Sequence, residues 1–402
     1  MSARSRRSIL AAATAFSLLA AMAPTPLRAA DEVLNVLTWC DHEDPELLGP
    51  FEQANKVRIH FKDIDGTEAV RGILRQAQAG DWDVVIMEET AAPQLAAAGL
   101  LAPLDPAVFP ATDIPPAIAS PASGSYQGQL YSVPEKYGFH AVAFNQAHVS
   151  APDMDDINAP WQPRYKGRIA IYDSYLPILS YVALALGLDP DHLTEADLPA
   201  LHDKLAALRA NASLVGDTAS VQQALADGQV DIVVGGGGWT TAGVDEGGTV
   251  TTADADAHAP PPRPDLTFTV PRQGGIRWQH GISIVEASQR KALALAFARY
   301  LRTPAAQARL ATSSCYWGMP ANTRAPLDDA TRAALHWAQQ PAYIAASHSF
   351  PIVNDAMDAR LRALWADVMK DTSGGTPPTP ASMAAPQPAG DATGADEPTA
   401  QP

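Results

Sequence analysis

The residues from Val33 to Met87 follow a pattern of apolar and polar positions that predicts alternating strands and helices. The apolar run at 33–37 has the length of a buried parallel strand. Residues 57–61 alternate apolar and polar side chains, which is typical of a half-buried strand. Pro45 and the spaced apolar residues after it are typical of a helix. We expect five elements, at 33–37, 45–54, 57–61, 69–77 and 82–87. Such repeated units predict a parallel sheet covered by helices on both faces.

The expected site lies where the strands of this sheet end. Ligands of such sheets bind beyond the carboxyl ends of the strands. Two segments follow strands there, Trp39–His42 after the first strand and Glu88–Thr90 after the third. Because adjacent residues of a strand point to opposite sides, we expect Glu88 to face a cleft and Glu89 to face solvent, or the reverse.

The rest of the chain, up to about residue 370, continues to alternate strand and helix patterns. Strands are expected at 130–134, 139–144, 168–171, 230–234, 266–270 and 281–285. Helices are expected at 93–101, 176–186, 195–211, 221–225, 291–301 and 355–370, with a further helix beginning at Pro304. The pattern predicts an α/β fold with two lobes, between which the chain crosses more than once.

Both ends of the chain are predicted to lie outside the fold. Residues 1–30 combine a basic start with an apolar run too short to span a bilayer, which indicates a secretory signal peptide. The pair Arg6-Arg7 is similar to a twin-arginine export signal, and a basic segment that happens to hold two arginines is the alternative. Residues 371–402 have few large apolar side chains and are predicted to be disordered. We therefore expect a periplasmic protein.

Composition narrows the classes of function. The 402 residues carry a formal net charge of −16, which argues against nucleic acid and anionic membranes as partners. The sequence contains no GxSxG, HExxH or P-loop motif, and we expect no cofactor and no metal. A periplasmic hydrolase that uses Glu88 or Asp173 with His280 is the competing class. The lack of a recognisable activated nucleophile argues against an enzyme.

Three tryptophans stand beside or just after expected strands. They are Trp39, Trp239 and Trp278. Indole faces pack on apolar stems and attract cations by roughly 0.5–2 kcal/mol each, so these positions favour a ligand cleft. The alternative is that each indole fills a core. His42 and His280 flank two of the tryptophans, and for each a hydrogen-bonded structural role is the alternative to ligand binding.

Eight segments keep an order and spacing that are together specific. They are the strand ending in Trp39, GDWDVV (80–85), GLLAPLD (99–105), YSVPEKYGFHAVAFN (131–145), PRYKGRIAIYD (163–173), DGQVDIVVGG (227–236), RQGGIRWQHGISI (272–284) and CYWGMPAN (315–322). In these segments the chain resembles the periplasmic spermidine/putrescine-binding proteins of ABC importers.

The resemblance implies a two-lobe periplasmic-binding-protein fold, type II-like, with a hinge and an interlobe ligand cleft. It places lobe one at 31–138 plus 281–323 and lobe two at 139–280 plus 324–370. It also implies a small-molecule ligand, a monomer, and membrane permease subunits of an ABC importer as partners.

The resemblance carries over unevenly to individual ligand contacts. Trp39 and Trp278 match the aromatics that sandwich the methylene stem of a polyamine. At the position of the family's third aromatic residue this chain has Gly236. Trp239 is the candidate to take the place of that aromatic residue.

At other positions the family's residue type changes. His42 stands where the family has tyrosine, Glu88 and Thr90 stand at hydroxyl positions, and Asp173 adjoins positions where acids are expected. His280 stands where the family has the aspartate that binds an amine of the ligand. An imidazole carries no negative charge and therefore cannot replace a carboxylate as the partner of an ammonium. The expected ligand is a polyamine or a related amine-containing compound. A solute that bears a carboxylate is the alternative.

The chain contains two cysteines, Cys40 and Cys315. An even pair in an oxidising compartment permits one disulfide. The resemblance brings the segment that starts at Cys315 back to the first lobe near the hinge, the end where Cys40 follows the first strand. A disulfide between them is therefore expected, and two buried thiols are the alternative.

Overall fold

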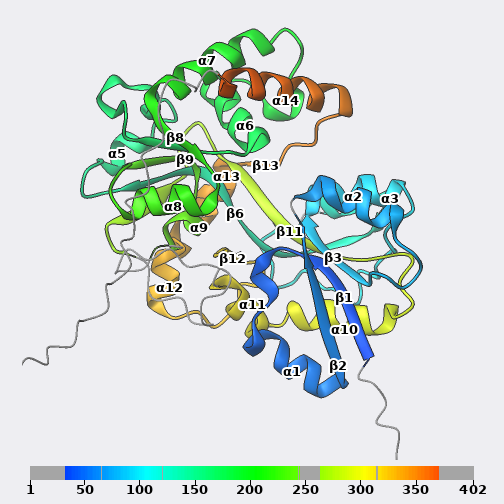
Figure 1. Cartoon of the computed structure of the whole chain (residues 1–402). Helices are drawn as coiled ribbons and strands as arrows, with labels where there is room; N and C mark the ends of the chain where they lie inside the picture. The colour runs from blue at the N-terminus through cyan, green and yellow to red at the C-terminus, as the bar shows by residue number, and fades with distance from the viewer. Residues whose placement is uncertain are drawn as a thin grey trace, which may run out of the picture. The chain divides into compact units, whose positions relative to one another are not determined.

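The computed structural model describes residues 32–64, 66–119, 121–242, 244, 263–313 and 316–370 (Figure 1). The predicted signal peptide and the predicted disordered tail lie outside the described residues. Within the described part of the chain, no helix combines the length and the apolar character that a membrane span requires.

The described residues form two compact units. Unit 1 comprises residues 32–136 and His280–Leu327, and unit 2 comprises residues 137–279 and 328–370. The chain therefore passes between the units after Lys136, after Gln279 and after Leu327. The lobe borders expected after residues 138, 280 and 323 stay a prediction.

Unit 1 contains a sheet with the strand order β2-β1-β3-β11. Its strands are β1 (Glu32–Thr38), β2 (Val57–Asp63), β3 (Val84–Glu88) and the end of β11 (Ile276–Ile284). β1 pairs in parallel with β2 along its whole length and with β3 at Val36 and Leu37. The parallel pairing expected for the first three strands is confirmed, and β11 adds antiparallel to β3, which makes the sheet mixed.

Helices cover both faces of this sheet. Figure 1 shows α2 and α3 on one side of β1 and β3, and α1 and α10 on the other. Alternate residues of each strand enter two separate cores: Val36 and Ile86 join the core that includes residues of α1 and α10, whereas Leu37 and Met87 join the core that includes residues of α2 and α3. The helices of unit 1 are α1 (Pro45–Asn55), α2 (Thr67–Gln76), α3 (Ala92–Ala97), α4 (Pro121–Gly124), α10 (Lys291–Leu301) and α11 (Pro304–Ala311).

Short elements complete unit 1. They are the 3-10 turns η1 (Cys40–His42) and η2 (Glu89–Ala91), the hairpin of β4 (Ser125–Tyr126) and β5 (Gln129–Leu130), and β12 (Met319–Pro320).

Unit 2 contains a second mixed sheet segment, with the order β6-β9-β7-β8. Its strands are β6 (Ser132–Asn145, from Tyr137 onward), β7 (Ile169–Tyr172), β8 (Ala212–Gly216), β9 (Ile232–Gly236) and β10 (Leu266–Thr269), with the two-residue β13 (His348–Ser349). β7 is parallel to β8 and β9, and β6 is antiparallel to β9 and β10.

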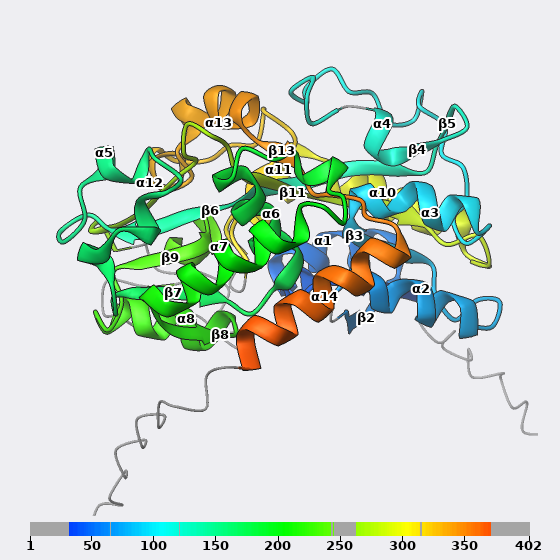
Figure 2. The ribbon, with the colours of Figure 1, turned by 90° about the horizontal axis from the view of Figure 1, so that it is seen from above.

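The helices of unit 2 bury an apolar core against these strands. They are α5 (Ala151–Met154), α6 (Tyr175–Ala185), α7 (Leu198–Asn211), α8 (Thr218–Ala226), α9 (Gly238–Ala242), α12 (Asp329–Ala334), α13 (Gln340–Ala346) and α14 (Asp355–Lys370), with the 3-10 turns η3 (Ala159–Trp161), η4 (Pro163–Tyr165), η5 (Pro190–His192) and η6 (Trp337–Gln339). α6 is buried along most of its length because it is apolar on nearly all sides. Figure 2 shows α14 running alongside α7, which it contacts.

Two strand predictions differ from the structure. Residues 132–134 of the first expected strand and the strand expected at 139–144 form one continuous strand, β6, because Gly138 is packed under the Trp278 ring instead of forming a turn, whereas Leu130 belongs to β5. A β-carbon at Gly138 would lie 2.4 Å from Cζ2 of Trp278. β11 begins at Ile276, five positions before the expected start at Gly281. Both strands extend through residues at which the chain changes unit.

Candidate ligand-binding site

The carboxyl end of the unit 1 sheet brings three predicted site residues together. Trp39 follows the last residue of β1, and Glu88 is the last residue of β3. The antiparallel pairing of β11 with β3 sets His280 directly opposite Glu88. The rings of Trp39 and His280 stack, with centroids 5.4 Å apart and planes 13° apart. This edge of the sheet therefore presents aromatic rings beside a carboxylate.

Tyr316 adds a third ring to this group. Its ring stacks on His280, with centroids 5.9 Å apart and planes 19° apart. We call Trp39, His280 and Tyr316 the aromatic stack. Among the described residues, the buried Nε1 of Trp39 has no hydrogen-bond acceptor. A buried N–H without an acceptor is costly, so the stack leaves one donor for an acceptor that the described chain does not supply.

The two carboxylates at the end of β3 are both buried. Glu88 is 7% exposed and Glu89 is 1% exposed, so the expectation that one of them faces solvent is wrong. The reason is that η2 begins at Glu89 and turns the chain away from strand geometry. Oε2 of Glu89 accepts a hydrogen bond of 2.8 Å from the hydroxyl of Ser123. Thr90, in the same turn, is also buried.

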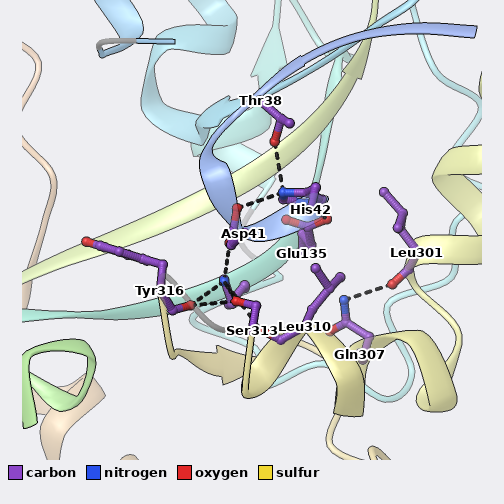
Figure 3. Close-up of polar contacts among 10 residues, drawn as sticks. Thr38, Asp41, His42, Glu135, Leu301, Gln307, Leu310, Ser313 and Tyr316 are labelled. Atoms are coloured by element: carbon purple, nitrogen blue, oxygen red, sulfur yellow. Dashed lines mark hydrogen bonds and ion pairs between the residues drawn. The ribbon is translucent and has the colours of Figure 1, made fainter. Parts of the chain in front are cut away.

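A cluster of four ionisable side chains is buried beneath the loop that carries Trp39. We call Asp41, His42, Glu135 and Lys136 the ionic cluster, and their side chains have no exposed surface (Figure 3). Nδ1 of His42 lies 2.7 Å from Oδ1 of Asp41, and Nε2 of His42 lies 2.9 Å from Oε1 of Glu135. Lys136 forms an ion pair with Asp41. Two acids and two bases therefore share one interior site.

The carboxylates keep His42 charged. Burial by itself would lower the pKa of His42, but the carboxylates of Asp41 and Glu135 outweigh burial and raise its pKa to about 10. Burial would likewise raise the pKa of Asp41, but His42 and Lys136 hold it well below its usual value. The cluster thus contains a histidinium at neutral pH, and its charges balance.

The ionic cluster also determines where the aromatic stack lies. Nζ of Lys136 donates a hydrogen bond of 2.7 Å to the backbone carbonyl of Tyr316. Thr38, the residue before Trp39, places its hydroxyl 2.9 Å from Nδ1 of His42. Both outer members of the stack are thereby connected to the same buried charges. The ring nitrogens of His42 thus contact side chains of unit 1 and its ring is buried, which favours the structural role stated as the alternative, and the ligand contact at His42 stays a prediction.

The predicted site residues of unit 2 have different surroundings. Trp239 is 5% exposed and stacks on Tyr172, with ring centroids 4.5 Å apart. Trp278 is 2% exposed and lies over Gly138. Asp173 is exposed, and its Oδ1 accepts a hydrogen bond of 3.1 Å from Nε1 of Trp365 in α14. The burial of Trp239 favours the core role given as its alternative, and its ligand contact stays a prediction.

Cys40, the residue after Trp39, is disulfide-bonded. Its expected partner, Cys315, lies outside the described residues, so that pairing stays a prediction. The free-thiol alternative is wrong for Cys40.

One group within the described residues has the spacing of metal ligands. Asp189, Asp191 and His348 each offer a ligand atom, and these atoms lie within 4.8 Å of one another. Asp189 already accepts hydrogen bonds from His192 and from the backbone of Asp191 at the start of η5. These hydrogen bonds account for the positions of Asp189 and Asp191 in the turn.

The two α/β units and the aromatic residues at strand ends are typical of the class of ligand-binding receptors. The chain matches the bacterial extracellular solute-binding protein family over residues 46–343. It therefore belongs to that family of solute-binding proteins, and the expectation drawn from the sequence resemblance is confirmed.

Individual relatives are distant. The spermidine/putrescine-binding periplasmic protein 1 of Haemophilus influenzae is 22% identical over 259 residues, which cover 64% of this chain and 66% of the relative, just under two thirds. The spermidine/putrescine ABC transporter substrate-binding protein of Streptococcus pneumoniae has a TM-score of 0.67 at 19% identity, over 84% of this chain and 99% of that one. A PBP of A. tumefaciens B6 in complex with glucopine has a TM-score of 0.59 at 18% identity, over 83% and 99% of the two chains. The two-lobe α/β fold of these proteins is thus the fold of this chain.

Sequence reasoning missed the partners of two predicted residues. Glu135 and Lys136 stand in the segment YSVPEKYG, where adjacent charges inside an apolar stretch were a signal of buried pairing. Tyr316 stands in CYWGMPAN, but its position on His280 depends on a return of the chain that no local pattern shows.

Proposed function

We propose that the chain captures a small polar solute, a polyamine or related amine-containing compound, and delivers it to the permease subunits of an ABC importer in the periplasm. The ligand would be held between the two lobes, and the protein would act as a monomer. The observation that carries the proposal is the aromatic stack with Glu88 at the carboxyl end of the unit 1 sheet.

The chemistry of this group fits an amine on an alkyl stem. Faces of Trp39 and Tyr316 would pack on methylene groups and attract a nearby cation. Glu88 is the acid beside the stack that would meet an ammonium group. A charge-assisted hydrogen bond from the ammonium to Glu88 would replace the one that the family forms with an aspartate at the position of His280.

A carboxylate-bearing solute is the second candidate. It is favoured by the Nε1 donor of Trp39, which no acceptor among the described residues meets, and by the imidazole of His280 in place of an acid. A ligand with both an amine and an acceptor oxygen would satisfy Glu88 and Trp39 together. The glucopine complex of the A. tumefaciens neighbour is one instance of a non-polyamine ligand on this fold.

The test is a binding screen by thermal shift, followed by calorimetry. The ligands are putrescine, spermidine, amino acids and opines. We expect one class to bind and to be recovered unaltered after denaturation. Trp39→Ala and Tyr316→Ala should each lower affinity by about 1–3 kcal/mol.

Trp82→Ala is the matched control. Trp82 lies just before the amino end of β3, at the opposite end of the strand from Glu88. It should lower stability and leave affinity unchanged. Equal affinity losses for Trp39→Ala and Trp82→Ala would contradict a site at the aromatic stack. Conversion of a ligand to a product would contradict a purely binding role.

A further inference from the structure

Unit 1 contains a cavity that is separate from the aromatic stack. Its volume is about 190 Å³, and none of Trp39, Glu88, His280 or Tyr316 lines it. This volume is below the roughly 300–1,000 Å³ of pockets for larger organic ligands, yet it accommodates several waters or a small solute. All its lining residues belong to unit 1.

The walls of this cavity are positively charged, although the chain as a whole is acidic. Arg299, Arg302 and Arg324 line it together with a single acid, Asp113. Asp113 pairs with Arg324, with Oδ2 and Nη2 2.6 Å apart. Three positive charges and one negative charge leave a formal excess of 3 − 1 = +2. An excess of this sign in a chain with net charge −16 favours an anionic occupant.

Arg302 is the residue best placed to bind that occupant. Its guanidinium lies 5.5 Å from the ring centroid of Phe109 and donates one hydrogen bond, of 3.3 Å, to the carbonyl of Pro110. A guanidinium has five N–H donors, so the described residues leave most of them for another acceptor. Burial lowers the pKa of Arg302 and outweighs the carboxylate of Glu89, which raises it, so the side chain is partly dehydrated.

The start of α11 contributes to the same cavity. Thr303 is the N-cap residue of this helix and Pro304 its first residue, and both line the cavity. Pro304 has no N–H, and the N–H of Ala306 donates to the hydroxyl of Thr303. The helix therefore contributes its dipole, which favours a negative charge near this end. Arg302 directly precedes this cap, so a guanidinium and a helix start meet at one wall.

We propose that this cavity binds a small oxyanion, a carboxylate or a phosphate, at Arg302, Arg299 and the start of α11. The planar fork of a guanidinium matches both kinds of oxyanion with two parallel hydrogen bonds. Val108, Phe109 and Ile114 add apolar side chains to the lining of the cavity.

The test titrates the full chain with inorganic phosphate, with acetate and with chloride at matched ionic strength. Calorimetry and thermal shift are the readouts, and no transport ligand is present. We expect saturable binding of phosphate or acetate but not of chloride, and a Kd about tenfold or more weaker in Arg302→Gln. Which of the two oxyanions binds more tightly distinguishes a phosphate site from a carboxylate site.

Arg299→Gln is the second variant, because Arg299 is exposed and its replacement should not disturb folding. Arg75→Gln is the control, since it removes one exposed arginine of unit 1 that does not line the cavity. Anion binding that is unsaturable, or that weakens equally in Arg299→Gln and Arg75→Gln, would overturn the proposal.

Discussion

Replacing His42 by glutamine removes the positive charge that lies between the carboxylates of Asp41 and Glu135. The pKa of His42 is raised from 6.5 to about 10 in the folded protein. Each pKa unit corresponds to about 1.4 kcal/mol, which gives an upper figure of about 5 kcal/mol for stabilisation by the charged ring. Losing one partner of a buried ion pair typically costs about 3–5 kcal/mol, in agreement with that figure.

The pH dependence of this loss is specific. Because the folded pKa lies above the unfolded pKa, the stabilisation is fully present below about pH 6.5 and disappears as the pH rises toward 10. The pKa of Asp41 is held well below its usual value by His42 and Lys136, so this carboxylate does not titrate in the same range. The difference in unfolding free energy between wild type and His42→Gln should therefore be large at pH 6 and should shrink markedly by pH 9.5.

Urea unfolding without reducing agent measures this difference. His60→Gln is the matched control, because His60 is an exposed histidine on β2 of the same unit. That variant should follow the wild-type pH profile. A difference between wild type and His42→Gln that is constant from pH 6 to pH 9.5 would refute the reasoning about a charged, buried ring.

Three further predictions concern ligand choice, packing and the disulfide. His280→Asp restores an acid opposite Glu88 and should raise spermidine affinity about tenfold by calorimetry; unchanged affinity would show that residue 280 does not meet the amine. Gly138→Ala sets a β-carbon 2.4 Å from Trp278 and should cost about 1–3 kcal/mol in urea unfolding, whereas wild-type stability would mean that the indole shifts freely. Reduction of the Cys40 disulfide should cost about 4–5 kcal/mol if Cys315 closes the loop, and two free thiols in the denatured, unreduced protein would contradict the pairing.

The sequence predicts the first βαβαβ segment well because its signals are local. Residues 57–61 alternate apolar and polar side chains, and β2 shows that alternation of burial. Pro45 marks the first residue of α1 as expected, with Asp44 as its cap. The positions of Trp39 and Glu88 at strand ends follow from the same pattern.

The remaining site contacts depend on residues distant in sequence. His280 faces Glu88 only because β11 adds antiparallel to β3, a pairing that neither strand's own pattern specifies. His42 fits a ligand position in sequence, but Glu135, 93 residues later, makes it part of the interior. Apolar periodicity indicates which face is buried and does not indicate which buried charges will meet.

The order of segments in unit 1 has a consequence for how the chain acquires its structure during synthesis. The strand that completes the β3 side of the sheet arrives nearly 200 residues after β3, since His280 pairs with Glu88. Until then, a nascent chain ending anywhere in unit 2 exposes an unpaired edge at Val84–Glu88, a run of mostly apolar residues that is fully buried in the finished fold. Unpaired apolar edges invite association between chains. A chaperone that holds the chain open until residue 284 has emerged would therefore protect this protein more effectively than one that releases it after the first 136 residues.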